Sequence, residues 1–162
     1  MPGTRASANL MACNCAALRK AARRVSLLYD RYLTRSGLTI GQYAILAEIE
    51  CRPKHDRPTL GELARALVMD RTALSHTLKP LERDGLLRLE SDQLDRRARL
   101  ISLTARGRER AAVARACWVE AQAHFSKTFG RDQAIALQAL LRIVTDADFG
   151  ETPRPPSVTN FG

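Results

Sequence analysis

The sequence predicts a mainly α-helical protein with one small β hairpin. Of its 162 residues, 45% are hydrophobic but only 5% are aromatic, a balance that favours helices over a β sandwich. Apolar residues recur at intervals of three and four along most of the chain, which is the period of an amphipathic helix. Two short runs near residues 86–90 and 99–103 are strand-like instead. The length suits one hydrophobic core, so we expect residues 1–162 to form a single domain.

The N-terminal third of the chain predicts two helices. A first amphipathic helix falls within residues 10–35, where Leu18, Val25 and Tyr29 recur at helical spacing until Ser36-Gly37 stops it. Thr39 opens a second helix, which the two prolines of C-R-P-K-H-D-R-P end.

The middle of the chain predicts a helix-turn-helix followed by a hairpin. Thr59-Leu60-Gly61-Glu62 fits a capping box, in which Thr59 and Glu62 satisfy each other's free backbone amides. Asp70 caps a second short helix, which Asp84-Gly85 ends with glycine in the left-handed position. The strand-like runs that follow flank a turn and form a wing. Residues 39–103 are therefore predicted to be a winged helix-turn-helix.

Two further helices are expected at the C-terminal end. Thr104 caps a long helix to about Phe129, and a last helix runs from about Asp132 to Ala147. The last helix has an apolar face that consists of Ile135, Leu137, Leu140, Leu141 and Val144. Because one domain core hardly needs this additional face, we expect residues 10–35 and 104–148 to be dimerisation helices. Residues 149–162 form a proline-rich, linker-like tail.

The net charge of the chain indicates its kind of partner, and its lack of long apolar runs indicates its location. A formal charge of +9 favours polyanions or an anionic membrane surface. No apolar run is long enough to span a membrane, and the first residues lack the apolar stretch of a secretory signal, so we expect a cytoplasmic protein without membrane association. The four cysteines are then expected to be reduced, and their spacing does not suit zinc, so no metal and no cofactor is expected.

The sequence argues against one class of function and leaves another open. The chain has no Gly-rich phosphate loop, nucleophile elbow or H-E-x-x-H motif, so we expect that it is not an enzyme. A basic architectural or RNA-binding protein that ignores sequence would account for the charge equally well. That alternative stays open at this stage.

Two segments resemble the MarR family of bacterial transcription regulators. They are T-L-G-E-L-A-R-A-L-V-M-D-R-T-A-L-S-H-T-L-K-P-L-E-R-D-G-L-L-R-L and D-R-R-A-R-L-I-S-L-T-A-R-G, which match the LA, LE-x-x-G and D-x-R…LT-x-x-G pattern of the family. The resemblance implies a homodimer that binds a pseudo-palindromic operator in double-stranded DNA. It also implies a protein that usually represses transcription and that dissociates from its operator when a small ligand or an oxidant changes the shape of the dimer.

DNA contacts are expected from the second helix of the helix-turn-helix and from the wing. The N-terminal part of such a helix meets base edges in the major groove. Here its residues are Arg71, Thr72, Ser75, His76 and Lys79. The wing carries Arg96, Arg97 and Arg99, which are suited to an adjacent minor groove. The resemblance further implies that Asp95 orients Arg97, as in the D-x-R motif.

A cysteine-based sensor is the first hypothesis for regulation. Cys15 lies one turn before Arg19 at a predicted helix start, and both features favour a reactive thiolate. Cys13 lies two residues earlier, so a helix covering both would hold the thiols apart. The spacing from Cys15 to Tyr29 and Gln42-Tyr43 resembles the organic hydroperoxide resistance branch, which implies that Tyr29 hydrogen-bonds the thiol. Ile40 replaces the second tyrosine of that branch.

A ligand pocket is the competing hypothesis. An aromatic or phenolic acid could lie between the dimerisation helices and the DNA-binding part, as the resemblance implies. The residues expected around it are Arg19, Arg23, Tyr29, Tyr32, Tyr43 and Trp118. Each of them is equally suited to the core or to the surface.

Overall fold

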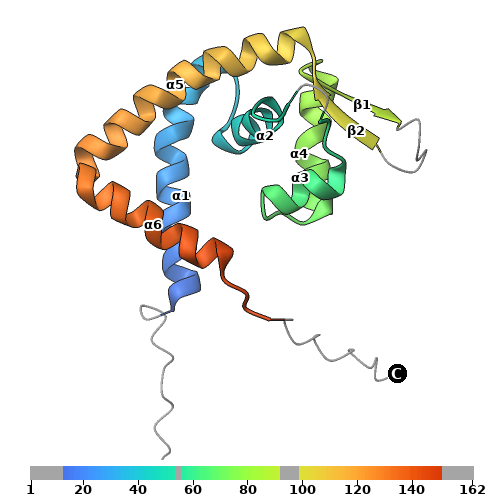
Figure 1. Ribbon diagram of the computed structural model, residues 1–162. Coiled ribbons are helices and arrows are strands. Elements are labelled where there is room, and N and C mark those ends of the chain that lie inside the picture. The colour runs from blue at the N-terminus through green and yellow to red at the C-terminus, as the bar shows by residue number, and fades with distance from the viewer. Residues whose placement is uncertain (1–12, 54–55, 92–98, 151–162) are drawn as a thin grey trace, which may run out of the picture. The chain divides into compact units, whose positions relative to one another are not determined.

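The computed structural model describes residues 13–53, 56–91 and 99–150. By its contacts the chain forms two compact units, one up to His124 and one from Phe125 onward. The elements are α1 (Asn14–Leu33), the 3-10 turn η2 (Thr34–Ser36), α2 (Ile40–Glu50), α3 (Leu60–Ala66), α4 (Arg71–Arg83), β1 (Leu87–Ser91), β2 (Arg99–Leu103), α5 (Ala105–Phe129) and α6 (Arg131–Asp146) (Figure 1). The predicted fold class, mainly helical with a two-stranded wing, is confirmed.

The capping residues predicted from the sequence set the helix starts. The Thr59 hydroxyl accepts from the Glu62 amide at 3.3 Å, and the Glu62 carboxylate accepts from the Thr59 amide at 2.8 Å. The Asp70 carboxylate accepts from the Ala73 amide at 2.8 Å, and Thr104 Oγ1 accepts from the Gly107 amide at 2.9 Å. Each bond satisfies an amide that has no partner inside its helix.

The first helix is shorter than predicted. It begins at Asn14, and Cys13 precedes it as an N-cap residue with an extended backbone and no side-chain capping bond. The helix ends at Leu33, where η2 carries the chain to Gly37 in the left-handed region. Within the first unit, α1 packs against α2, and its Tyr29 hydroxyl donates to Gln122 of α5 at 2.5 Å.

The core of the first unit lies where the helix-turn-helix meets α2 and the wing. Its largest fully buried side chains include Leu33, Ile45, Leu46, Leu63, Leu74, Leu81, Leu87 and Ile101. They come from helices and from both strands, so Leu87 of β1 and Ile101 of β2 anchor the wing to the core. Strands β1 and β2 are antiparallel, with Leu87 opposite Leu103 and Ser91 opposite Arg99. The Ile101 amide also donates to the Pro58 carbonyl at 2.9 Å, which fastens the segment before α3 to β2.

Gly107 sits where α5 meets the segment after α4. A Cβ atom at this position would lie 1.8 Å from the Leu86 carbonyl oxygen, so only glycine fits. The same carbonyl accepts from the Thr104 amide at 3.1 Å, and Thr104 Oγ1 donates to the Gly85 carbonyl at 2.7 Å. The start of α5 is thereby fixed against the end of the helix-turn-helix.

The turn between α3 and α4 contains a strained residue that the sequence did not reveal. Val68 has φ 51°, in the left-handed region, and 74% of its surface is exposed. A β-branched side chain is unfavourable there, whereas glycine adopts this backbone freely. We expect Val68→Gly to stabilise the protein by about 1 kcal/mol, because the relieved strain exceeds the added chain entropy.

Urea unfolding of the Val68→Gly variant checks this expectation. The matched control is Val113→Gly, at a half-exposed site inside α5, which should destabilise by about 0.5 kcal/mol. Destabilisation of the same size at both positions would contradict a strained turn.

The second unit exposes much of its apolar surface. In α6 the large apolar side chains that are exposed belong to Ile135, Leu140, Leu141, Ile143 and Val144, whereas Ala134 is buried. Phe125 and Phe129, at the end of α5, stack with ring centroids 5.3 Å apart. Across the described ranges, no helix combines the length and the apolar character that crossing a membrane requires.

Candidate nucleic-acid interface

Helix α4 has two chemically distinct faces. Leu74, Leu78 and Leu81 are buried and attach the helix to the core. The opposite side exposes Arg71, Thr72, His76 and Lys79, and leaves Ser75 partly exposed. The structure therefore brings all five predicted recognition residues to the first three turns of one helix, where hydroxyl, imidazole and cationic groups can meet the edges of bases.

Arg71 extends back across the first turn of α3. A Cβ atom added at Gly61 would lie 3.0 Å from Arg71 Nη2, so the glycine leaves room for the guanidinium. Close by, the Thr59 amide and hydroxyl both donate to the Glu62 carboxylate, which lowers the pKa of Glu62. Glu62 therefore stays ionised at neutral pH and serves as a capping group for α3.

The described part of the wing carries basic groups. Arg99 is exposed at the start of β2, as expected for a residue near a wing tip. The predicted wing residues Asp95, Arg96 and Arg97 lie outside the described residues. Their roles remain predictions.

Sequence reasoning missed two arginines beside the wing. Arg88 is exposed on β1 with its guanidinium 3.5 Å from the Glu90 carboxylate, and Arg57 bonds the same carboxylate at 2.6 Å. One carboxylate thus faces two cations, so this edge keeps a net positive charge. Arg88 could have been noticed, because alternation along a strand places it on the same side as Glu90. The contact with Arg57 depends on the fold.

Cys13 and Cys15 are both free and exposed at the start of α1. Cys13 precedes the helix, so the condition under which the two thiols were expected to be held apart, a helix that covers both, is not met. Tyr29 lies about 21 Å along the same helix from Cys15, at 1.5 Å per residue. A bond between this tyrosine and the Cys15 thiol could therefore form only between two chains.

The residues predicted to line an aromatic-acid pocket lie in different environments, some of them buried and some exposed. Tyr32 pairs with His124 of α5 through a 2.7 Å hydrogen bond to Nδ1, and Trp118 is half-buried. Tyr43 is buried on α2, whereas Arg19 is exposed on α1.

Two of these residues have further features. Arg23 lines a separate open cavity of about 380 Å³ on α1, together with Leu27 and Asp30. Burial raises the pKa of Tyr29, whose hydroxyl is bound to Gln122, so this phenol stays protonated at neutral pH.

Comparison with known proteins identifies relatives. Residues 36–98 match the model described as the MarR family. The transcriptional regulator MosR of M. tuberculosis, solved in complex with DNA, is 36% identical with a TM-score of 0.66, over 80% of this chain and 97% of that one. The transcriptional repressor CouR, bound to a 23-mer DNA duplex, is 25% identical with a TM-score of 0.74, over 85% of this chain and 95% of that one.

A curated relative matches over a shorter segment. The transcriptional activatory protein BadR of Rhodopseudomonas palustris is 35% identical over 78 residues. These are 48% of this chain and 45% of BadR, so the match spans less than half of that relative. The family match lies on the helix-turn-helix and wing, and the likeness to MosR extends over nearly all of that protein. The chain therefore belongs to the MarR family of winged-helix transcription regulators.

Proposed function

We propose that this protein is a sequence-specific regulator that binds double-stranded DNA as a homodimer. The observation that carries the proposal is the exposed face of α4, where Arg71, Ser75 and His76 stand opposite a buried row of leucines. A helix fixed in this way can enter the major groove with its N-terminal residues at the bases. Arg99 and Arg88 of the wing would contact the neighbouring phosphates of the DNA backbone or the minor groove.

The homodimer is supported by apolar side chains that are exposed to solvent in a single chain. Leu18 of α1 is 41% exposed, and Ile135 and Leu140 of α6 are 60% and 61% exposed. Burying such side chains against a second copy would be favourable. We therefore assign residues 10–35 and 104–148 to dimerisation. A two-fold dimer would place its recognition helices about 34 Å apart, on half-sites about 10 bp from centre to centre.

Repression is the proposed direction of control. CouR is described as a repressor and BadR as an activatory protein, so relatives of both kinds exist. A reporter gene behind the protein's own upstream DNA decides the direction. Higher reporter expression after deletion of the protein supports repression, and lower expression contradicts it.

DNA binding should depend steeply on salt. A basic recognition helix and wing displace counterions from phosphates, so log affinity should fall linearly with log salt. With about six phosphate contacts per dimer, the affinity should fall roughly a thousandfold between 50 and 200 mM salt. Titration of the operator duplex at several salt concentrations measures the slope, and a flat dependence would contradict the proposed interface.

The wing motif gives a second expectation. If Asp95 holds Arg97 ready for the minor groove, Asp95→Ala should weaken operator binding about tenfold although it makes the protein more positive. Glu48→Ala, on α2 and outside both the dimerisation segments and the predicted DNA contacts, is the charge-matched control and should leave binding unchanged or slightly stronger. Stronger binding by both variants would show that the wing acts by general charge attraction alone.

Two signals are proposed for release from DNA. The first is oxidation of Cys15, with Cys13 as a neighbouring thiol, because both are exposed at the start of α1. The second is an aromatic or phenolic acid. To release DNA, either signal must bind or modify the DNA-incompetent conformation more favourably than the DNA-competent one.

Organic peroxide separates these two signals. Wild-type protein should lose operator binding after treatment and recover it with a thiol reductant, whereas Cys15→Ser should keep binding. Cys51→Ser, which removes another exposed thiol, is the control and should respond like the wild type. Equal loss in Cys15→Ser, or no loss in the wild type, would exclude the cysteine mechanism.

A further inference from the structure

The guanidinium of Arg71 lies on helix α3, although the residue itself belongs to α4. A Cβ atom added at Gly61 would lie 3.0 Å from Nη2, 3.5 Å from Cζ and 3.6 Å from Nε of Arg71. The three atoms nearest to the added Cβ thus belong to one planar group, which covers the open surface of the glycine. Arg71 is the first residue of α4, and the side chains of a helix lean toward its N-terminus. Its charged group is therefore set apart from the later turns of the reading face.

The turn between the two helices fixes Arg71 in this place. The Met69 amide donates to the Ala64 carbonyl at 2.8 Å. The Val68 amide donates to the Arg65 carbonyl at 3.2 Å. These backbone bonds determine where α4 begins relative to α3, so the approach of the guanidinium to α3 does not depend on a loose linker.

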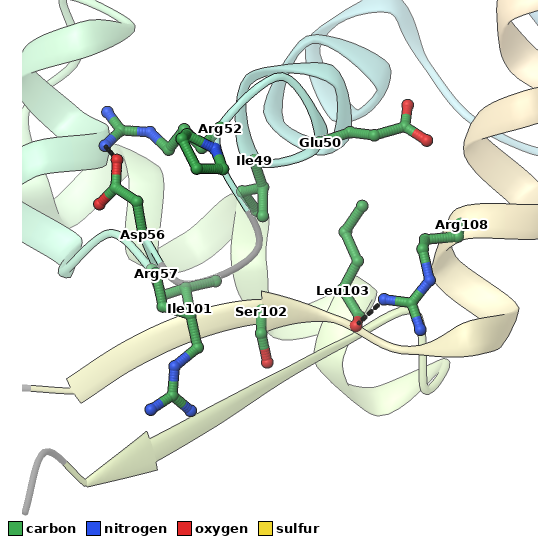
Figure 2. A pocket seen from close by; sticks show the side chains of 10 residues that line it. Ile49, Glu50, Arg52, Asp56, Arg57, Ile101, Ser102, Leu103 and Arg108 are labelled. Atoms are coloured by element: carbon green, nitrogen blue, oxygen red, sulfur yellow. Dashed lines mark hydrogen bonds and ion pairs between the residues drawn. The ribbon is translucent and has the colours of Figure 1, made fainter.

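Arg71 is also a cation without a carboxylate partner. It is exposed and forms no ion pair with any residue that the structure describes. Two arginines that precede α3 differ in this respect. Figure 2 shows Arg52 bonded to Asp56, at 3.3 Å. Arg57 is bonded to Glu90 at 2.6 Å. The positive charge of Arg71 is thus available to an anion outside the chain.

We propose that Arg71 contacts a phosphate of the DNA backbone, and that Gly61 is the positioning residue for this contact. The inference rests on the proposed binding to DNA and concerns the role of one residue within it. In a helix-turn-helix the second helix reads base edges, whereas the first crosses the DNA backbone. A guanidinium that lies on the first helix is therefore placed beside phosphates, whose oxygens it can bind through two parallel hydrogen bonds. The choice of operator would then depend on the other predicted recognition residues, among them Ser75 and His76.

Removing the guanidinium should weaken binding to every duplex by the same factor. Arg71→Ala is expected to lose about tenfold in affinity on the operator and on random duplex alike, because phosphates are common to both. The slope of log affinity against log salt should become shallower by about two, one for each copy in the dimer. His76→Ala should instead lose much more affinity on the operator than on random duplex.

Three results would overturn the phosphate contact. Arg71→Ala could lose affinity on the operator alone, it could tolerate a base pair that the wild type rejects, or it could bind both duplexes as the wild type does. Equal affinity of the wild type for the operator and random duplex would reject sequence-specific regulation instead. A uniform loss in Arg71→Ala would support the phosphate contact even then, because phosphates do not depend on sequence.

The role of Gly61 is tested by filling the space that the guanidinium occupies. Gly61→Leu should lose about as much affinity as Arg71→Ala on both duplexes. The urea midpoint of unfolding should not fall, because leucine suits a helix better than glycine. In the double variant the two losses should not add, since either change removes the same contact.

Gly41→Leu is the matched control for this substitution. Gly41 also follows a capping threonine by two residues, but the nearest atom to an added Cβ is the Thr39 hydroxyl at 4.0 Å. Its binding to DNA should equal that of the wild type. Additive losses in the double variant would mean that leucine at position 61 disturbs the DNA surface directly, and would contradict a positioning role for Gly61. Unchanged binding by Gly61→Leu would contradict it as well.

Discussion

Replacing Gly107 with alanine is expected to destabilise the protein by roughly 3 kcal/mol, the upper end for an overpacked site. The added Cβ would lie 1.8 Å from the Leu86 carbonyl oxygen and 2.8 Å from its carbon. Both are backbone atoms, so no side chain can rotate away to make room. Moving Leu86 would also stretch its bond with the Thr104 amide, which joins the wing to α5.

Chemical denaturation measures the loss at Gly107, and Gly41→Ala is its control. Gly41 also lies in a helix, but the nearest atom to an added Cβ is the Thr39 hydroxyl at 4.0 Å. Alanine there should stabilise the protein by about 0.5 to 1 kcal/mol through its helix propensity. A loss below about 1 kcal/mol for Gly107→Ala would mean that α5 and the segment before β1 can separate at little cost.

Replacing His76 with alanine is expected to weaken binding to the operator by about 1 to 3 kcal/mol, the scale of one base contact. His76 is exposed on α4, between Thr72 and Lys79 on the predicted reading face. The variant should also tolerate substitutions at one base pair that the wild type rejects. Affinity measurements on a set of single-base operator variants record both effects.

The control for this experiment is the other described histidine. His124 is exposed on α5 and bonds Tyr32, outside the helix-turn-helix, so His124→Ala should leave the affinity of the assembled dimer for the operator unchanged. If His76→Ala weakens binding equally on every operator variant, His76 contacts phosphate. If it has no effect, α4 does not read DNA through this residue.

The sequence could predict the parts of the fold that depend on local bonds. Thr59, Asp70 and Thr104 begin their helices because a side-chain oxygen reaches an amide three residues away, a distance fixed by the chain itself. Gly85, with φ 68°, ends α4 for an equally local reason. The reading face of α4 could also be predicted, because helical periodicity separates it from the leucines.

Other features depend on segments that are distant in the chain. The L-T-x-x-G motif was recognisable, but the need for glycine at position 107 comes from Leu86, on another segment. Val68 is a different case, because local backbone bonds close its turn, from Val68 to the Arg65 carbonyl at 3.2 Å and from Met69 to the Ala64 carbonyl at 2.8 Å. Valine nevertheless gives no sequence signal for the left-handed backbone found there, which favours glycine. The cavity lined by Ile49, Ile101 and Arg108 (Figure 2) requires residues from α2, β2 and α5 to meet, which no spacing in the sequence specifies.

The start of α1 shows why helix ends are harder to predict than helix centres. Periodicity indicated a helix through Cys13, but the helix begins at Asn14 without a side-chain cap. Periodicity does not mark a terminus, and no capping residue stands there to do so. The difference matters for function, because it takes Cys13 off the helical surface that was expected to hold it apart from Cys15.

Footprinting of the protein on its own upstream DNA, with random duplex as competitor, tests the central claim most directly. A sequence-specific dimer should protect a pseudo-palindrome with half-sites about 10 bp apart and should hold it against a large excess of competitor. Protection that disappears in proportion to the added random duplex, without a preferred site, would contradict this account and support a basic protein that binds nucleic acid regardless of sequence.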